Sequence, residues 1–255
     1  MTLPAELQSR IEEIRNDFTN GSSVIAWNVL NLLADAIKII DESDKDNILD
    51  LAKELLSAKP HMAGPTNILE IFNKQFPRYS TKSEIANFLN KLNSDLLLAS
   101  DTCVSLAIEK LIEKEKTSIL TCSYSSNVFN IISSAKSKMT VYILQSIWNG
   151  IDYGEIWIDK LSDLNVECNV LSEDDAIPVI DFALIGADAV LYSGDIINGI
   201  PSLYLAKSMK KIGIPLFVVA ESFKKCKQIP IIDGFEQIPN ELISDIITDD
   251  IFNQD

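Results

Sequence analysis

The chain has 255 residues, of which 47% are hydrophobic, so it is long enough to bury a sizeable core. Its 37 Asp and Glu residues against 22 Lys and Arg residues give a formal net charge of −15, which disfavours direct binding to nucleic acids or anionic lipid. The first residues are charged where a signal peptide would be apolar, and no apolar run reaches the length of a membrane span. We therefore expect a folded, soluble, cytoplasmic protein.

The first part of the chain has the hydrophobic spacing of helices. Leu7, Ile11, Ile14 and Phe18 recur at three- and four-residue intervals, which predicts one apolar helical stripe. Similar spacing continues through residues 23–40, 45–58, 66–76 and 82–116. Prolines predict breaks at Pro60, at Gly64-Pro65 and at Pro77. We expect a helical domain over residues 1–110.

After Lys116 the hydrophobic period changes. Six short runs rich in Val, Ile, Leu and Phe follow, namely TSILTC, MTVYIL, VECNVL, FALIGA, PLFVVAE and SDIITD. Helical segments separate most of them, and this alternation is typical of a parallel sheet with crossover helices. We expect an α/β domain over residues 115–255, joined to the helical domain by a long helix.

A serine-rich loop, Thr121–Val128, follows the first of these runs. The next helix is expected to begin near Ser125, and hydroxyls and free amides at a helix start can bind an anion. Ser125 and Ser126 are therefore candidate ligand-binding residues, with a plain helix cap as the alternative.

Cys122 and Ser123, in the same loop, are candidate nucleophiles. The single histidine, His61, lies in the helical half, so a Cys-His or Ser-His pair would depend on one long-range contact. A buried thiol and a capping serine are the alternative. The four cysteines lie far apart with no Cys-x-x-Cys pair, so we expect reduced, mostly buried thiols, no metal site and no cofactor.

Acidic side chains follow two of the later runs. Asp188 comes directly after FALIG and an alanine, and Glu221 closes PLFVVA with Lys224 three residues further on. A carboxylate at the carboxyl end of a strand is often functional in an open α/β sheet, although a helix or loop cap would place one there too. Glu221 and Lys224 can form an ion pair that serves either packing or a pocket. Asp195 follows a glycine and is typical of a tight turn.

Four segments occur in the order and spacing of one known family: ILTCSYSSNV, MTVYILQS, LIGADAVLYSGDIINGIPSLYLA and IPLFVVAESFK. The chain resembles the family that holds the regulatory alpha, beta and delta subunits of translation initiation factor 2B, ribose-1,5-bisphosphate isomerase and methylthioribose-1-phosphate isomerase. The resemblance covers nearly the whole chain and is strongest from Ile119 to Lys224. VVAESFK and the Tyr-Ser of TCSYS look most like the alpha subunit, whereas Gly-Ala-Asp looks more like the isomerases.

This resemblance implies a helical amino-terminal domain on a Rossmann-like carboxyl-terminal domain, through which the family dimerises. It also implies that, in the isomerases, a cysteine in the first-strand loop and the aspartate of Gly-Ala-Asp work as a pair on the sugar carbons. The aspartate is Asp188 here, but the cysteine position aligns with Ser123, and Cys122 lies one residue earlier.

Three cationic positions that the resemblance assigns to phosphate binding are neutral in this chain. TNGSS at 19–23 replaces a basic Arg-Gly-Ala stretch, QSIW at 145–148 replaces Glu-Ser/Thr-Arg-Pro, and NGIPS at 198–202 replaces Asn-Lys-Ile-Gly-Thr. The chain also ends soon after DIITDD, without most of the final helix that the resemblance leads us to expect.

Two functions are therefore alternatives. The favoured one is a non-catalytic protein related to the factor 2B regulatory subunits, which forms a homodimer or higher oligomer, contacts a translation-factor partner and holds a small sugar phosphate or nucleotide. The other is a divergent sugar-phosphate aldose-ketose isomerase that uses Asp188 with Ser123 or Cys122. Apolar residues of SIWNGIDYGEIWI are expected at an interface between copies.

Both alternatives use one cleft at the carboxyl ends of the strands. Its expected walls are residues 121–126, 186–188, 194–198 and 220–222. The candidate ligand-binding residues in and around it are Ser125, Ser126, Gly186, Asp195, Asn198, Glu221 and Lys224.

Overall fold

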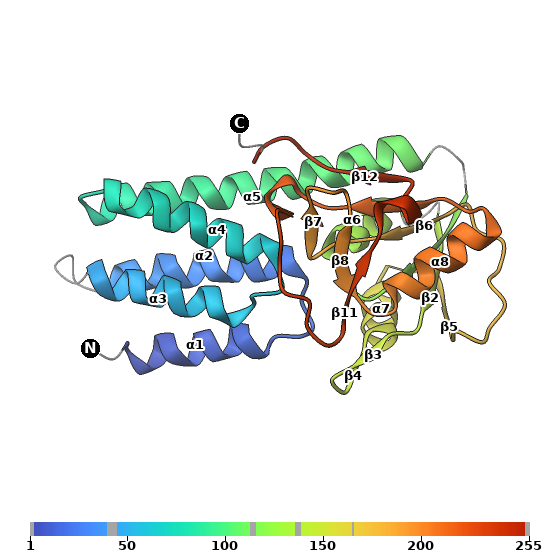
Figure 1. Ribbon diagram of the computed structural model, residues 1–255, viewed down its shortest axis with the longest axis horizontal. Coiled ribbons are helices and arrows are strands. Elements are labelled where there is room, and N and C mark those ends of the chain that lie inside the picture. Colours follow the sequence, from blue (N-terminus) through green and yellow to red (C-terminus); the bar gives the residue numbers. More distant parts are fainter. Residues whose placement is uncertain (1–2, 40–44, 113–115, 136–138, 165, 253–255) are drawn as a thin grey trace.

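The structure of the chain is a computed structural model that describes residues 3–39, 45–112, 116–135, 139–164 and 166–252. A bundle of helices leads into a sheet flanked by helices (Figure 1), so the expected fold class, a helical region followed by a parallel-sheet α/β region, is confirmed. Some of the last residues expected for three helices, at 40, 113–115 and 136–138, lie outside the described residues.

The helical region contains α1 (Ala5–Asn16), α2 (Ser22–Ile39), α3 (Lys45–Ala58), α4 (Ala63–Gln75) and α5 (Lys82–Leu111). Their apolar stripes meet in one core, with α2 in contact with the other four helices. The break expected at Gly64-Pro65 is wrong, because α4 already begins at Ala63. A proline is tolerated in the first turn of a helix, where its missing N–H has no partner within the helix.

Among the described helices, α2 alone is long and apolar enough to cross a membrane by length and composition. Half of it is buried inside the protein, where it packs against α1, α3, α4 and α5. Such burial is typical of the core helix of a globular fold.

The main sheet has six parallel strands in the order β12-β9-β6-β1-β2-β5. Their bounds are β1 (Thr117–Cys122), β2 (Met139–Leu144), β5 (Glu167–Leu171), β6 (Phe182–Ile185), β9 (Leu216–Val219) and β12 (Asp245–Ile247). Each of the six apolar runs singled out in the sequence contains one of these strands. Buried parallel strands are apolar on both faces, which is why continuous runs predicted them.

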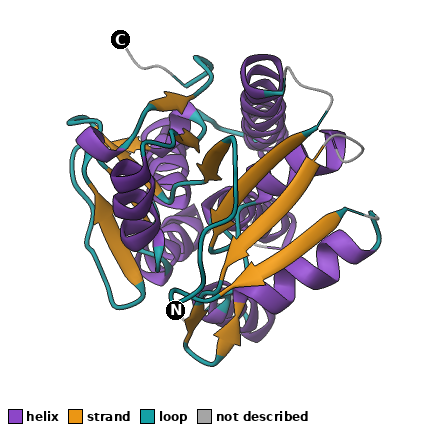
Figure 2. Cartoon of the chain, turned by 90° about the vertical axis from the view of Figure 1, so that its right-hand side faces the viewer, coloured by secondary structure: helices purple, strands orange, loops and turns teal. Residues whose placement is uncertain are grey.

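Helices cover both faces of this sheet (Figure 2). On one face α6 (Ser126–Ala135), α7 (Tyr153–Ser162) and the carboxyl-terminal half of α5 share a core with residues such as Ile119 and Leu184. On the other face α8 (Ser202–Ile212) packs on Leu120, Ile185 and neighbouring side chains. Helix α5 therefore supplies side chains to two cores, because its first half is buried in the helical region.

Two smaller sheets lie beside the main one. The first has the order β10-β7-β8-β11 and is formed by β7 (Ala189–Leu191), β8 (Ile196–Gly199), β10 (Lys225–Cys226) and β11 (Phe235–Ile238). The second is the hairpin of β3 (Ile147–Trp148) and β4 (Ile151–Asp152), which projects from the α/β region in Figure 1. The positive φ angles of Asn149 (51°) and Gly150 (77°) suit a two-residue hairpin turn. This hairpin was not predicted from the sequence.

Candidate functional site

Three buried carboxylates lie at the carboxyl ends of three neighbouring strands. Asp188 follows β6, Glu221 follows β9 and Asp249 follows β12, and these strands are adjacent in the sheet. Their exposed fractions are 8%, 0% and 3%. An isolated buried charge is strongly unfavourable, so each carboxylate needs partners close by. Several of these partners come from the helical region.

Asp188 lies between the first turns of two helices. Its carboxylate accepts a hydrogen bond from the backbone N–H of Ser22 at the start of α2, and its backbone carbonyl accepts one from the N–H of Ala63 at the start of α4, at 2.9 Å. Both helix N-termini carry partial positive charge, which favours a carboxylate beside them. Burial raises the pKa of Asp188 to about 6, and the opposing influences are Lys224, the Ser22 N–H and Lys59.

The same junction brings α2 and α4 very close together. The Gly64 N–H donates to the Ser22 hydroxyl oxygen at 3.2 Å, and a Cβ atom at position 64 would lie 2.5 Å from that oxygen. Glycine is therefore the residue that fits at this helix crossing.

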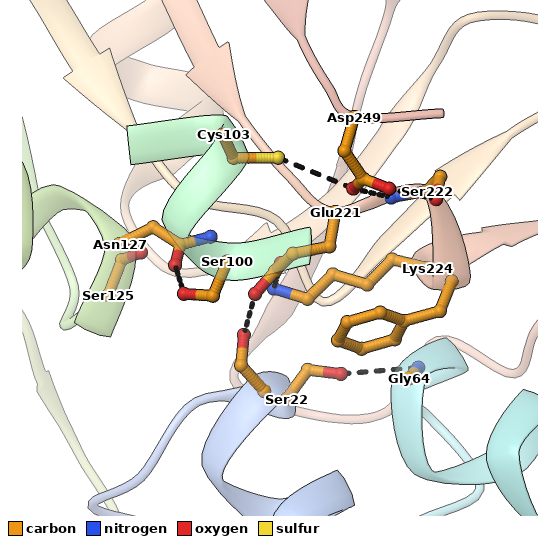
Figure 3. A network of polar contacts seen from close by, with 12 residues as sticks. Ser22, Gly64, Ser100, Cys103, Ser125, Asn127, Glu221, Ser222, Lys224 and Asp249 are labelled. Carbon is orange, nitrogen blue, oxygen red and sulfur yellow. Dashed lines mark hydrogen bonds and ion pairs between the residues drawn. The ribbon is translucent and has the colours of Figure 1, made fainter. Parts of the chain in front are cut away.

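Glu221 forms a buried ion pair with Lys224, with 2.9 Å between Oε2 and Nζ (Figure 3). The hydroxyl of Ser23, in the first turn of α2, donates to the other carboxylate oxygen at 2.7 Å. Burial opposes the charge of Glu221, but Lys224 and the hydrogen bonds from Lys224 and Ser23 keep its pKa below the ordinary value. The ion pair expected from the sequence is present and holds the start of α2.

Asp249 completes this network. Its carboxylate accepts hydrogen bonds from the backbone N–H and the hydroxyl of Ser222, and from the thiol of Cys103 in α5 at 3.5 Å (Figure 3). Asn67 of α4 adds two hydrogen bonds from its side-chain amide to the carbonyls of Phe223 and Lys225, both 2.8 Å long. This sheet edge, where open α/β folds keep their ligands, is thus largely occupied by the protein's own helical region.

A small pocket remains beside Asp188, between the segment before α2 and the loops after β1 and β8. Its lining residues are Phe18, Thr19, Asn20, Gly21, Met62, Ser123, Tyr124, Trp148, Tyr153, Asp188, Gly199, Ile200, Gly234 and Phe235. Asp188 is the one charged residue among them. The free volume is about 30 Å³, which is room for one or two water molecules. The three segments in which the sequence departs from the isomerases all contribute to this lining.

Two basic side chains that sequence reasoning did not select lie in the wall behind this pocket. Lys59 donates to the carbonyl of Asp17 at 2.7 Å, and its Nζ lies 4.0 Å from the centre of the Phe18 ring. Burial lowers the pKa of Lys59 to about 8 and that of His61 to about 4. The ring of His61 packs on Phe235, 4.5 Å between centres, so the single histidine is a buried neutral side chain at physiological pH.

Ser123 and Asp188 are the two predicted catalytic residues that the structure brings to the same pocket. Ser123 has a positive φ of 54° and its carbonyl accepts a hydrogen bond from Trp157. The third candidate, Cys122, is buried in the core on the α8 side, 3.4 Å from the hydroxyl of Ser202, and burial raises its pKa to about 12. Such a thiol is not a nucleophile near neutral pH.

The remaining predicted ligand residues lie outside this pocket's lining. Ser125 caps α6 by accepting from the Val128 N–H at 3.5 Å, and Ser126 is the first residue of that helix. A Cβ atom at Gly186 would lie 2.4 Å from the Ser125 hydroxyl, so the two residues serve close packing. Asn198 donates to Ser202 at 2.8 Å.

Asp195 is a turn residue, as the sequence suggested. It lies between β7 and β8, where it accepts hydrogen bonds from Gln237 and from the backbone of Asn240. Over the described part of the chain, no three His, Cys, Asp or Glu side chains gather as metal ligands.

The aromatic residues of the pocket were missed because they come from four distant segments. Phe18 lies beyond the end of α1 and not on its apolar stripe, and it meets Tyr124, the neighbouring Trp148 and Tyr153, and Phe235 only after folding. One local signal was available, since Asn-Gly between short apolar runs in IWNGID indicates a hairpin turn and therefore a special placement of Trp148.

The sequence of this chain matches known proteins over most of its length. A sequence model of the initiation factor 2 subunit family matches residues 19–247. A protein from Pyrococcus furiosus, named as translation initiation factor eIF-2B subunit 2-like, is 26% identical over 231 residues, which cover 87% of this chain and 80% of that protein.

Solved structures share the fold. The crystal structure of translation initiation factor eIF-2B from Pyrococcus horikoshii OT3 superposes with a TM-score of 0.83 at 20% identity, covering 96% of this chain and 95% of that one. A chain of the tetrameric eIF2B-beta2-delta2 complex from C. thermophilum gives a TM-score of 0.75 at 18% identity, covering 97% and 90%.

Breaking the buried ion pair should destabilise the protein strongly. We expect Lys224→Met to lower the free energy of unfolding by about 3–5 kcal/mol, because Glu221 is left buried without its cation. The double variant Glu221→Leu/Lys224→Met should lose much less than the sum of the single changes. Urea denaturation measures both, and Lys53→Met, which breaks the exposed pair with Asp50 at the same spacing, should cost at most about 1 kcal/mol. Equal losses at the two sites would contradict this assignment.

The raised pKa of Asp188 predicts a pH-dependent stability. In the unfolded chain Asp188 ionises near its ordinary pKa of 3.8, whereas the folded state keeps the proton until about pH 6. Its ionisation therefore weakens the fold as pH rises through this window, by about 3 kcal/mol. Urea titrations give the free energy of unfolding of Asp188→Asn and of the unaltered protein at each pH. We expect the value for the variant minus that for the unaltered protein to rise by this amount between pH 4 and pH 7.

Asp195→Asn is the matched control for this pH series, because hydrogen bonds from Asn240 and Gln237 lower the pKa of Asp195. It should show no such gain. If the difference in free energy of unfolding for Asp188→Asn does not change with pH, the helix N-termini and the lysines fully compensate the cost of burying the charged carboxylate, and the prediction is wrong.

Proposed function

Because the chain belongs to the initiation factor 2 subunit family, we propose that it is a non-catalytic relative of the eIF2B regulatory subunits. In this proposal it is a cytoplasmic protein that acts by assembling with copies of itself or with other translation-factor subunits. The small pocket beside Asp188 serves ligand binding and not turnover.

The observation that carries this proposal is the engagement of Asp188. Its carboxylate is hydrogen-bonded to the start of α2 and lies beside two lysines, so it already holds the helical region against the sheet. These hydrogen bonds give Asp188 a structural role without any catalytic one, and the protonated carboxyl group, whose burial costs less than that of the carboxylate, accepts them as well. Glu221 and Asp249 follow the next two strands and accept hydrogen bonds from Ser23 of α2 and Cys103 of α5, which supports the same interpretation.

The chemistry of the pocket also supports it. A sugar bisphosphate requires cations or several free donors, and no Lys or Arg is among the lining residues. The nucleophilic partner of the aspartate is a serine, and a hydroxyl cannot supply the thiolate that a cysteine provides near neutral pH. A free volume of about 30 Å³ also has no room for a sugar bisphosphate, so a ligand can enter only if a side chain of the pocket wall moves.

One observation favours the isomerase alternative. Ser123 and Asp188 line the same pocket, and a carboxyl group with a pKa of about 6 is suited to general acid-base catalysis near neutral pH. The two proposals therefore differ in whether a sugar phosphate binds and turns over.

Assembly is tested by mass in solution. We expect light scattering at tens of micromolar to give at least twice the 28.3 kDa of one chain, as the tetrameric complex among the structural neighbours suggests. In the segment selected from the sequence Trp157 is fully buried, but Ile147 and Ile158 are 56% and 44% exposed. Ile158→Glu should therefore weaken assembly. Ile212→Glu, on another helix with 49% exposure, is the control, and a monomer for the unaltered chain would contradict the proposal.

Catalysis is tested with ribose-1,5-bisphosphate. Since a hydrogen bond to a charged group contributes roughly 1.5–3 kcal/mol, three missing cationic anchors correspond to on the order of 4–9 kcal/mol of lost phosphate recognition. We expect no binding in calorimetry at micromolar concentrations and no turnover in a coupled assay. Micromolar binding with turnover that Asp188→Asn abolishes would establish the isomerase instead, provided that this variant is folded by circular dichroism.

A further inference from the structure

The pocket beside Asp188 has walls suited to a flat, uncharged ring. Five of its fourteen lining residues are aromatic, namely Phe18, Tyr124, Trp148, Tyr153 and Phe235. Its single charged side chain is a carboxylate, in a protein with a net charge of −15. Aromatic faces bind planar rings, and a carboxylate accepts N–H donors and repels anions.

One of these five rings fills the space that a ligand would need. The indole of Trp148 meets the rings of Phe18 and Phe235 nearly at right angles, with centres 5.2 Å and 5.8 Å apart. It also lies against the backbone of Gly234, where a Cβ atom would approach the indole to 2.2 Å. Its N–H donates to the carboxylate of Asp233 at 3.2 Å. Moving this side chain would leave an indole-shaped space bounded by Phe18, Phe235 and a glycine backbone.

The segment that carries Trp148 is weakly held. The β3-β4 hairpin forms only the residue pairs Ile147–Asp152 and Trp148–Ile151 and belongs to neither larger sheet. Its base is fixed, because the Ser146 hydroxyl donates to the Ile200 carbonyl and Asp152 caps α7. Its tip is anchored to the body of the protein through the contacts of Trp148. A two-stranded hairpin of this size is marginally stable alone, so the tip can move without disturbing the sheet.

We propose that this pocket binds an uncharged, planar, fused-ring heteroaromatic compound with an N–H donor, and that the indole of Trp148 occupies the ligand's place until the β3-β4 hairpin moves away. The proposal rests on the assignment of the pocket as a ligand site in the proposed function and names the class of ligand. The indole and the ligand compete for the same contacts, so the protein's apparent affinity is lowered by the fraction of molecules in which Trp148 is inside.

Indole, adenine and adenosine are the probes, with ribose 5-phosphate and adenosine monophosphate as anionic comparisons. We expect Trp148→Ala to bind at least one of the three uncharged probes about tenfold or more tightly than the unaltered protein in calorimetry, because the internal competitor is gone. Trp27→Ala, which removes a half-exposed tryptophan from the surface of α2, should leave the affinity unchanged. Asp233→Ala changes an exposed residue that accepts the hydrogen bond of the indole, so it should give a smaller increase and remain informative if Trp148→Ala does not fold.

Three outcomes would overturn the proposal. The first is that none of the three uncharged probes binds either folded variant at millimolar concentration. The second is that the affinity falls when Trp148 is removed. The third is that adenosine monophosphate binds more tightly than adenosine. None of these depends on ribose-1,5-bisphosphate turnover, so the ligand class and the non-catalytic function fail separately.

Discussion

The burial of three carboxylates at one edge of the sheet constrains the whole molecule. Asp188, Glu221 and Asp249 are removed from water, so each must be neutralised or hydrogen-bonded by groups held in place. Ser22 and Ser23 in the first turn of α2 and Cys103 of α5 supply part of this. These contacts fix the position in which the helical region packs on the sheet. The pocket beside Asp188 is the part of the sheet edge that the helical region leaves uncovered.

The sequence was informative wherever the physical cause was local. Each of the six apolar runs contains one strand of the main sheet, and the four inner strands were recognisable because a buried parallel strand is apolar on both faces. The β3-β4 hairpin and the β7-β8 pair were not predicted, because polar residues and glycines interrupt their short apolar stretches, as in IWNGID and AVLYSGDIING. At Gly64-Pro65 a general rule failed, because the same proline that ends a helix also fits its first turn.

For the pocket beside Asp188, the position of a residue after a strand was a better guide to which residues line the pocket than the type of its side chain. Asp188 and Ser123 were selected because both follow strands of a parallel sheet and because the family resemblance pairs their positions, and both line one pocket in the structure. Cys122 is the last residue of β1 and faces the core on the α8 side, as Leu120 does, whereas Ser123 lies beyond the strand with a positive φ and lines the pocket. Lys59 and Phe235 could not be found this way, because their closeness to the pocket comes from packing between segments far apart in the chain.

Helix α5 has a consequence for how this protein unfolds. Residues such as Leu89 and Leu96 belong to the core of the helical region, whereas Cys103 and Ala107 belong to the core of the sheet. A helix is a single hydrogen-bonded unit, so melting one half removes its side chains from one core and also shortens the helix that presents the other half to the second core. The two regions are thereby coupled into one cooperative unit, and a fragment cut near residue 110 would leave the apolar carboxyl-terminal face of α5 in water.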